Sequence, residues 1–287
     1  MTLWLIYQSE DVKKNEWYIN QYLQFGKEVG LDIDLVLTNQ LTMICMEGKY
    51  ILLRNNQQVE LPVAAIVRTI DPKLSRFLEF MGIRVFNRAL ISEICNDKAR
   101  TYQEIVSIQI PMIPTTCCKH KDLVRVLDNM TLPAVVKTVN GHGGQEVFLV
   151  HKLDIMVTDI LKKTTSDFVV QPLVGTRQQD LRVYVLGDNI ISAILRTSSS
   201  GFKANYSLGG TVQTYELNEL EKKIIEKIVQ RFSFDLVGID FIIGDDGELI
   251  FNEIEDVVGA RMLYQCTDIN LVKEYLRYIK QQIFDSR

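Results

Sequence analysis

The stretch from Val237 to Gly259 constrains the fold of this 287-residue chain more than any other. Alternating apolar residues lead to Asp240, a turn follows at 244–247, and a second apolar run leads into Glu253 and Glu255. Two such runs joined by an Asp/Gly turn predict a β-hairpin. Side chains alternate between the two faces of a strand, so Glu253 and Glu255 share one face. The obvious register then places Asp240 opposite them.

Three carboxylates on one face repel one another unless a cation lies between them. Mg²⁺ prefers oxygen ligands of this kind and usually binds beside phosphates. Asp240, Glu253 and Glu255 are therefore candidate metal ligands. From these residues alone, the alternative is a solvated acidic face on an edge hairpin, and we expect the other charged motifs to decide between the two.

The composition is that of an ordinary globular protein, with 47% hydrophobic and 24% charged residues. A net charge of −4 provides no basic field for nucleic acid, and no apolar run is long enough to cross a membrane. The five cysteines are scattered without a CxxC pair, which argues against a disulfide framework or a zinc site. The first residues lack a signal-peptide pattern. These features predict a reduced, cytoplasmic protein that binds neither nucleic acid nor membranes.

The first part of the chain alternates between strand and helix patterns. Apolar runs at 3–7, 32–37, 64–67 and 83–86 predict strands, and helical spacing appears at 15–29 and 72–81. This order is typical of a doubly wound α/β domain, in which ligands bind beyond the carboxyl ends of the strands. Arg68 follows one such strand. It is as much a candidate binding residue as an ordinary surface arginine.

The middle of the chain combines a lysine with a glycine loop. Residues 91–106 are predicted as one helix that contains Lys98. A strand at 134–136 then delivers Lys137, and the loop 140–144 follows. Backbone N–H groups of a glycine loop can approach phosphate oxygens, and a plain hairpin turn is the alternative. The order is not that of the Walker motif, whose lysine follows its glycines.

The C-terminal part is predicted to be α+β. A hairpin over 180–196 places Asp180 and Arg182 on one face and ends at Arg196 on the partner strand. The loop 197–210 holds Lys203 and Asn205, and loops of this length and composition are often functional. Helical spacing then predicts helices over 219–232 and 271–284.

The ordered set of motifs resembles the ATP-grasp superfamily, and most closely its RimK-type carboxylate–amine ligases. The set consists of Asn96-x-Lys98, Pro133-x-x-x-Lys137 with its glycine loop, Gln171-Pro-Leu-Val174, Asp180-Leu-Arg182, Arg196, Phe202-Lys-Ala-Asn205, Gly238-Ile-Asp240 and Glu253-Ile-Glu255. The resemblance covers essentially the whole chain. It implies an N-terminal α/β domain over 1–95, a central ATP-grasp subdomain over 96–170, and a C-terminal subdomain over 171–287, with ATP held between the last two.

The resemblance also implies roles for individual residues. The implied ATP-binding residues, from the phosphate lysines through the flap to the adenine side, are Lys98, Lys137, Gly141, Gly143, Gly144, Gln171, Leu173, Val174 and Asp180. The implied catalytic residues, which face the phosphoryl group and the acyl substrate, are Arg182, Arg196, Lys203 and Asn205. The implied metal ligands are Asp240 and Glu253, to which the hairpin pattern adds Glu255. The implied substrate-binding residues are Arg68, Asn87 and Arg261.

Members of this family activate a carboxylate as an acyl phosphate, join it to an amine, and release ADP and phosphate. The resemblance therefore implies ATP and Mg²⁺ as cofactors. The implied partners are an anionic carboxylate and an amine acceptor, which can be a small molecule, a peptide or a protein tail, and the habit of the family implies a homodimer or tetramer. Phosphoryl transfer needs positioning and charge neutralisation more than a nucleophilic side chain, which agrees with the lysines and arginines found here.

One motif departs from the family pattern. Glu255 stands where the family usually has Asn, and the turn that follows lacks its usual proline. The added charge could change metal binding, and Arg261 could act as its counter-ion. Two alternatives to a ligase therefore stay open. The chain could be a non-catalytic ATP-binding or scaffold protein with the ATP-grasp fold, or a kinase that stops after phosphorylating a small substrate.

Overall fold

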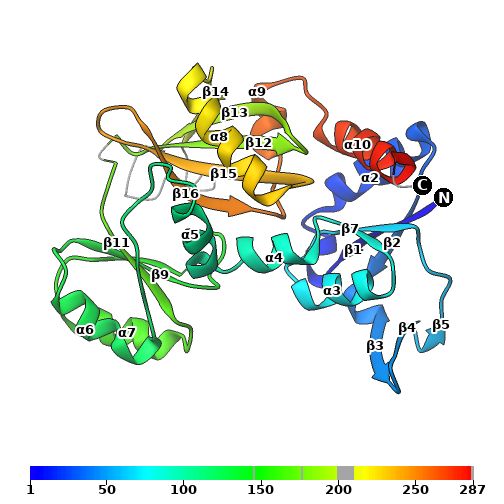
Figure 1. Ribbon diagram of the computed structural model, residues 1–287, viewed down its shortest axis with the longest axis horizontal. Coiled ribbons are helices and arrows are strands. Elements are labelled where there is room, and N and C mark those ends of the chain that lie inside the picture. Colours follow the sequence, from blue (N-terminus) through cyan, green and yellow to red (C-terminus); the bar gives the residue numbers. More distant parts are fainter. Residues whose placement is uncertain (145, 176, 199–209, 286–287) are drawn as a thin grey trace.

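Figure 1 shows the computed structural model, which describes residues 1–144, 146–175, 177–198 and 210–285. The chain forms an N-terminal part in blue and cyan, a central part in green, and a C-terminal sheet whose strands run from green to orange. The N-terminal sheet is parallel, and the central and C-terminal sheets are antiparallel. This architecture confirms the predicted α/β class with an α+β C-terminal part, whereas the domain limits stay a prediction.

The N-terminal sheet has the strand order β2-β1-β6-β7, with parallel neighbours throughout. Leu5 of β1 lies opposite Leu35 on one side and Ile66 on the other. Continuous apolar runs of this kind suit parallel strands that are covered on both faces. The elements of this part are β1 (Thr2–Tyr7), α1 (Ser9–Val12), α2 (Glu16–Val29), β2 (Asp32–Leu37), β6 (Ala64–Val67), α3 (Pro72–Phe80), β7 (Arg84–Phe86) and α4 (Ala89–Cys95).

Local signals set the helix ends in this part. Gly30 follows α2 with a φ of 77°, a left-handed conformation that costs glycine little. The side chain of Asp71 accepts a hydrogen bond from the backbone N–H of Leu74 (2.9 Å) and caps α3, whose first residue is Pro72. Between β2 and β6 lies a small antiparallel sheet that the sequence analysis did not predict, with β3 (Leu41–Met46), β4 (Lys49–Arg54) and β5 (Gln57–Gln58).

The prediction of one helix over 91–106 is wrong, because the structure has two helices there. α4 ends at Cys95 and α5 (Lys98–Val106) begins after a break at Asn96 and Asp97. The Asp97 carboxylate accepts a hydrogen bond from the backbone N–H of Arg100 (2.9 Å) and caps the second helix. Lys98 is therefore the first residue of a new helix, close to the central part.

The central and C-terminal sheets face each other and carry most of the charged motifs. The central elements are β8 (Thr116–Cys118), α6 (Leu123–Asp128), β9 (Ala134–Thr138), β10 (Val147–Val150), α7 (Ile155–Lys163) and β11 (Phe168–Pro172), with the strand order β10-β9-β11-β8. The C-terminal sheet has the order β14-β13-β12-β15-β16, formed by β12 (Gln179–Leu186), β13 (Asn189–Thr197), β14 (Thr211–Thr214), β15 (Leu236–Ile243) and β16 (Leu249–Glu255), and α8 (Glu219–Phe232) covers it.

The last helix returns to the N-terminal part. α9 (Arg261–Cys266) leads to α10 (Leu271–Asp285), which lies beside α2 in Figure 1. Tyr275 and Ile279 of α10 are buried in the same apolar cluster as Leu5 and Tyr22. The two ends of the chain therefore share one core. Among the described residues, no helix combines the length and the apolar character that a membrane crossing requires.

Asn87 ties the N-terminal part to the C-terminal sheet. Its Nδ2 donates to the backbone oxygens of Leu236 (2.7 Å) and Asp256 (3.1 Å). Its Oδ1 accepts from the backbone N–H groups of Asp235 (2.7 Å) and Leu236 (3.1 Å). These four bonds use both donors and both acceptor positions of a side chain that is 7% exposed.

We expect Asn87→Ala to lower the free energy of unfolding by about 3 kcal/mol, because buried backbone groups lose their partners and each costs about 1–3 kcal/mol. The measurement is chemical denaturation of the variant and the wild type. Asn129→Ala is the matched control, since Asn129 is exposed and its side chain donates to the carbonyl oxygen of Arg125 in the helix that it follows, not to another part of the chain. Equal effects of the two substitutions would contradict this account of Asn87.

Candidate functional site

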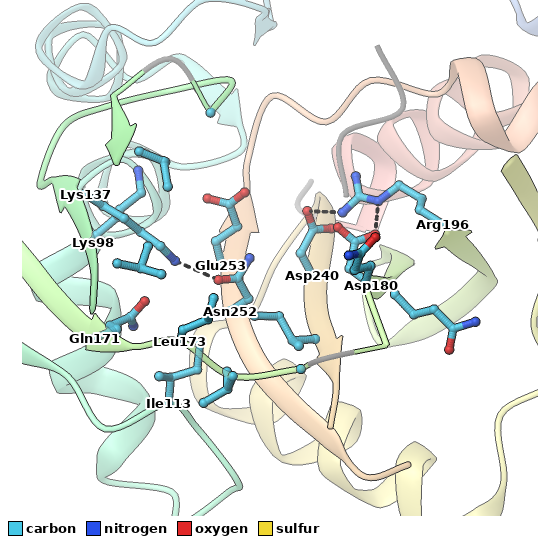
Figure 2. Close-up of a pocket in the computed structure, with 18 of the residues that line it drawn as sticks. Lys98, Ile113, Lys137, Gln171, Leu173, Asp180, Arg196, Asp240, Asn252 and Glu253 are labelled. Carbon is cyan, nitrogen blue, oxygen red and sulfur yellow. Dashed lines mark hydrogen bonds and ion pairs between the residues drawn. The ribbon is translucent and has the colours of Figure 1, made fainter. Parts of the chain in front are cut away.

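A cavity lies between the central sheet and the C-terminal sheet, and Figure 2 shows it with side chains that line it. Its volume is about 1050 Å³, including the space open to solvent. The residues of the sequence analysis that line it are Lys98, Lys137, Gly141, Gly143, Gly144, Gln171, Leu173, Val174, Asp180, Arg182, Arg196, Asp240, Glu253 and Glu255. The predicted residues Lys203 and Asn205 fall outside the described part of the chain.

Lys137 is a buried lysine on one wall of the cavity. It comes from β9, is 9% exposed, and its Nζ donates to Oδ1 of Asn252 (2.9 Å). Burial lowers the pKa of Lys137 to about 8; the carboxylate of Glu253 opposes this effect and the charge of Lys98 adds to it. Among the described residues, no carboxylate forms an ion pair with the Lys137 ammonium, so this buried cation is suited to bind an anion in the cavity.

Asn252 is a lining residue that the sequence analysis missed. β15 and β16 pair Asp240 with Glu253 and Phe241 with Phe251, so Asn252 is the extra residue of a β-bulge. The bulge lets Asn252 reach Lys137 while Glu253 stays opposite Asp240, as Figure 2 shows. A period-two pattern assigns one side chain to each face in turn, so no signal in the sequence marks this residue.

Lys98 lies at the glycine loop. Its Nζ donates to the carbonyl oxygen of Gly141, and its backbone N–H donates to the carbonyl oxygen of Val139 (3.0 Å). A Cβ on Gly141 would lie 2.3 Å from Oγ1 of Thr138, so a larger residue would not fit at this position. The Thr138 hydroxyl in turn donates to Glu146 across the loop (2.7 Å). The loop therefore starts beside both cavity lysines.

Gln171 of β11 lies on the same side of the cavity as the two lysines (Figure 2). Its Nε2 donates to the hydroxyl of Thr115 (2.8 Å), whereas its Oε1 is buried without a hydrogen-bond partner among the described residues. Apolar side chains that line the same cavity include Ile113, Leu173 and Val174. An unpaired acceptor next to apolar walls suits a flat ring that carries an amino group, such as a purine.

The other wall carries a network of carboxylates and guanidinium groups. Arg182 donates to Asp240 through Nε (2.7 Å) and Nη2 (2.6 Å), and to Oε1 of Glu255 (2.7 Å). Arg196 donates to Asp240 (2.9 Å) and also pairs with Asp180. Asp240 is 1% exposed and accepts from both arginines. Arg182 and Arg196 are also buried. Each charged group in the network has a partner of opposite charge at contact distance, as buried charges require.

The acids of the network titrate differently. Burial acts to raise the pKa of Asp240, but Arg182 and Arg196 outweigh it and hold that pKa below the usual range. Burial raises the pKa of Asp180 and of Glu255, and the lowering effect of their arginine partners does not cancel it. Asp240 therefore stays ionised over the whole physiological range of pH.

Three carboxylates converge at the edge of this network, as the hairpin pattern predicted. One oxygen each of Asp240, Glu253 and Glu255 can lie within 4.8 Å of the others. Glu253 makes no ion pair among the described residues. Its carboxylate can therefore bind a cation that is not part of the chain, such as a metal ion. An all-oxygen set of this kind fits Mg²⁺, which keeps some of its water and adds phosphate oxygens.

The three predicted substrate-binding residues do not line this cavity. Asn87 is fully hydrogen-bonded between the two parts of the chain, as described above. Arg68 lies at the end of β6, where its Nη2 donates to the carbonyl oxygen of Val258 (2.9 Å). Arg261 is exposed at the first position of α9.

A scan against family models matches residues 95–279 to the RimK-like ATP-grasp domain. The chain belongs to the RimK-like ATP-grasp family. The match covers every motif in the set on which the resemblance was based, from Asn96 to Glu255, and it confirms the prediction of this family.

This ATP-grasp chain is also similar to individual curated proteins. It is 32% identical over 188 residues to the uncharacterized protein MG011 of Mycoplasma genitalium, which covers 65% of this chain and 63% of that protein. It is 30% identical over 221 residues to human N-acetylaspartylglutamate synthase A, over 74% of this chain and 56% of the human protein. The chain thus spans less than two thirds of both relatives.

Solved structures confirm the ATP-grasp fold. The ATP-grasp ligase PsnB, complexed with a phosphomimetic variant of a minimal precursor, Mg and ADP, has a TM-score of 0.73 at 15% identity, over 98% of each chain. At this identity the likeness speaks for the fold alone. ATP and Mg²⁺ are the usual cofactors of ATP-grasp proteins, and the cavity described above has groups that fit both.

We expect ATP binding to the cavity between the central and C-terminal sheets to weaken as the pH rises through 8. The pKa of Lys137 is lowered to about 8, so its ammonium loses its charge above that pH, and a polyphosphate binds the charged form. Calorimetric titration of ATP between pH 6.5 and 9.5 should show affinity that falls by up to about tenfold per pH unit above the midpoint.

Two variants control this prediction. Lys137→Arg keeps its charge over the whole range, so the fall above pH 8 should disappear. Asn252→Asp places a carboxylate beside the Lys137 ammonium and should move the midpoint upward. A pH profile that is the same in all three proteins would show that Lys137 does not bind the nucleotide.

Proposed function

We propose that this ATP-grasp protein is a ligase that uses ATP and Mg²⁺ to join a carboxylate to an amine, releasing ADP and phosphate. One observation carries the proposal. Two lysines on one wall of a single cavity face three convergent carboxylates and two buried arginines on the other. A cavity with cationic groups for phosphates and oxygen ligands for a metal meets the needs of phosphoryl transfer.

The nucleotide is placed by groups at one end of the cavity. Oε1 of Gln171 accepts from the amino group of the purine, and the neighbouring apolar residues enclose the ring. Lys98 and Lys137 bind the phosphates, and the glycine loop at 141–144 covers them. The phosphate chain then points toward Asp240, Glu253 and Glu255, which would hold Mg²⁺. The bound ion supplies neutralisation of phosphate charge.

The arginines serve the reacting end. Arg182 and Arg196 are fixed by carboxylates on β12, β15 and β16, so their orientation is set before substrate arrives. A substrate carboxylate oxygen attacks the terminal phosphorus, an O–P bond forms, and the bond to ADP breaks. The amine then attacks the carbonyl carbon of the acyl phosphate, a C–N bond forms, and phosphate leaves with the proton that the amine loses. No nucleophilic side chain is required.

Glutamate is the substrate to test first. The name of the human relative contains glutamate as part of the product, and that relative shares 30% identity with this chain. We therefore propose an acidic amino acid or a short acidic peptide as one of the two substrates.

We expect ADP release to depend on both a carboxylate and an amine. The measurement is ADP release from ATP and Mg²⁺ with each substrate omitted in turn, and mass spectrometry of the product for a new amide bond. ADP formed without an amine, together with a stable phosphorylated product, would identify a kinase instead. Bound ATP without ADP release over a broad panel of acids and amines would identify a binding protein.

We expect Arg182→Lys to lower the rate of ADP release by about a hundredfold or more, since losing one stabilising donor costs roughly 3 kcal/mol in the transition state. Lysine keeps the charge but cannot bridge Asp240 and Glu255 as the guanidinium does. The affinity for ATP should change little, and thermal unfolding checks the fold. The matched control is Arg177→Lys, an arginine outside the network that bonds the carbonyl oxygen of Asp245.

A further inference from the structure

A surface pocket lies between α2 and the segment that joins α9 to α10. Its volume is about 380 Å³, including the space open to solvent. α2 contributes Trp17 and Gln21 to the lining, α9 contributes Tyr264, and residues 267–270 complete it. None of these residues lines the cavity of the candidate site or belongs to a motif of the family resemblance. We call this feature the Trp17 pocket, and the proposed ligase function does not account for it.

Two aromatic rings form a corner of the Trp17 pocket. The ring centres of Trp17 and Tyr264 lie 5.3 Å apart, and their planes are inclined by 74°. The ring centre of the buried Tyr18 lies 6.4 and 6.5 Å from those two, so both rings pack on the core of the N-terminal part. Trp17 is nevertheless 57% exposed. Fixed ring surfaces that meet at a corner and stay open to solvent are what proteins use to bind organic cations.

Asp268 supplies a negative charge at the pocket. It is exposed, and no hydrogen bond or ion pair joins its carboxylate to any residue that the structure describes. Lys273, the next basic residue along the chain, is paired with Glu28 (2.9 Å) and lies over the ring of Phe25. The side chain of Gln21 also has no partner within the described ranges. The Asp268 carboxylate and the Gln21 amide oxygen are therefore two acceptors that a ligand can use.

The polar groups at the start of α10 are used inside the protein. Oδ1 of Asn270 accepts from the backbone N–H of Lys273 (3.0 Å), and the hydroxyl of Tyr264 accepts from the backbone N–H of Val272 (3.2 Å). The hydroxyl of Thr267 donates to a backbone carbonyl oxygen of α9 (2.8 Å). An anion would therefore meet a capped helix end and a carboxylate, whereas a cation meets acceptors and ring surfaces. The charge of the pocket selects a cation.

A guanidinium group fits this set of residues better than an ammonium group does. It is planar, so it stacks on one ring of the corner while the N–H donors at its edge reach Asp268 and Gln21. An ammonium is compact and more strongly hydrated, so it gains less from ring surfaces that are open to water.

We propose that the Trp17 pocket binds a guanidinium group, carried either by a free molecule or by an arginine side chain of a peptide. Trp17 and Tyr264 provide the ring surfaces, and Asp268 provides the opposite charge. The affinity is weak, because the pocket is open and the buried Arg68 lies 5.2 Å from the centre of the Tyr18 ring. This binding is independent of the ligase function proposed above.

Tryptophan fluorescence reports on the pocket directly. The chain has two tryptophans, and Trp4 is only 1% exposed, so Trp17 is the one that a ligand reaches. N-acetyl-L-arginine amide carries a guanidinium group without a free carboxylate or amine, and N-acetyl-L-citrulline amide is its neutral counterpart of similar shape. At constant ionic strength, the arginine compound should change the emission of Trp17 with a Kd on the order of 1 mM. The citrulline compound should bind about tenfold more weakly, because it has lost the charge.

Three variants test which residues are responsible. Asp268→Asn should weaken the binding of the arginine compound about fivefold, as expected for the loss of an exposed ion pair. Trp17→Leu removes the reporter, so calorimetry measures its binding, which should be about tenfold weaker. Asp159→Asn is the matched control, since Asp159 is an exposed acid of α7 outside the pocket, and it should bind as the wild type does. Thermal unfolding without ligand checks that each variant is folded.

Two results would overturn the proposal. Equal binding of the arginine and citrulline compounds would show that the pocket does not recognise a positive charge. Binding of the arginine compound that Asp268→Asn leaves unchanged would place the cation elsewhere on the protein. N-acetyl-L-lysine amide that binds as tightly as the arginine compound would overturn the preference for a guanidinium group.

A further titration distinguishes the two sources of the guanidinium group. A short peptide with one central arginine that binds more tightly than the arginine compound would identify a peptide as the ligand. Equal affinities would identify a free molecule, because the flanking peptide backbone would then contribute nothing. None of these titrations contains ATP, so their failure would overturn the Trp17 pocket and leave the ligase function untouched.

Discussion

The candidate site depends on one interaction. The carboxylates of Asp180, Asp240 and Glu255 share two buried guanidinium groups. Arg182 and Arg196 both bond Asp240, and each takes a second acid, Glu255 or Asp180. Acids this close to one another could not stay ionised in a buried place without these partners. Removing one partner from such a network typically costs about 3–5 kcal/mol, because a charge is left buried without compensation. The network therefore fixes the position of the acidic hairpin, at which a further cation can bind.

The sheet register determines which group each acid of the hairpin faces. Asp240 lies opposite Glu253 on neighbouring strands, and the bulge at Asn252 shifts every later pair by one residue. Without that extra residue, one side chain could not face Lys137 while its neighbour faces Asp240. Glu255, which stands where the family usually has Asn, takes a guanidinium as its partner. The glutamate that stands in place of the usual asparagine is thus paired with an arginine of the same chain.

Much of the site could be predicted from the sequence, for different reasons at different residues. The convergence of Asp240, Glu253 and Glu255 follows from period-two alternation and a recognisable turn. The roles of Lys98 and Gln171 came instead from the resemblance to a family. The break between α4 and α5 was missed because apolar spacing continues across it. The carboxylate of Asp97 caps the start of the second helix.

Other features have no local signature in the sequence. The burial that lowers the pKa of Lys137 arises from strands that are distant in the chain, and so does its contact with Asn252. The resemblance to the family implied contact between Asn87 and a substrate. In the structure the Asn87 side chain bonds backbone groups of Leu236 and Asp256 and joins two parts of the chain.

The central claim is that the acidic hairpin is a metal site for the nucleotide as well as a partner for arginines. Calorimetric titration of ATP with and without Mg²⁺, on the wild type, Glu253→Gln and Asp246→Asn, tests it most directly. Of the three convergent carboxylates, Glu253 is the one that no arginine in the described part of the chain contacts, and Asp246 is an exposed acid at the turn of the same hairpin. We predict that Mg²⁺ strengthens ATP binding to the wild type and to Asp246→Asn, and that Glu253→Gln abolishes most of this gain. Binding that ignores both Mg²⁺ and the substitution of Glu253 would contradict the account and leave the hairpin as a purely structural acidic cluster.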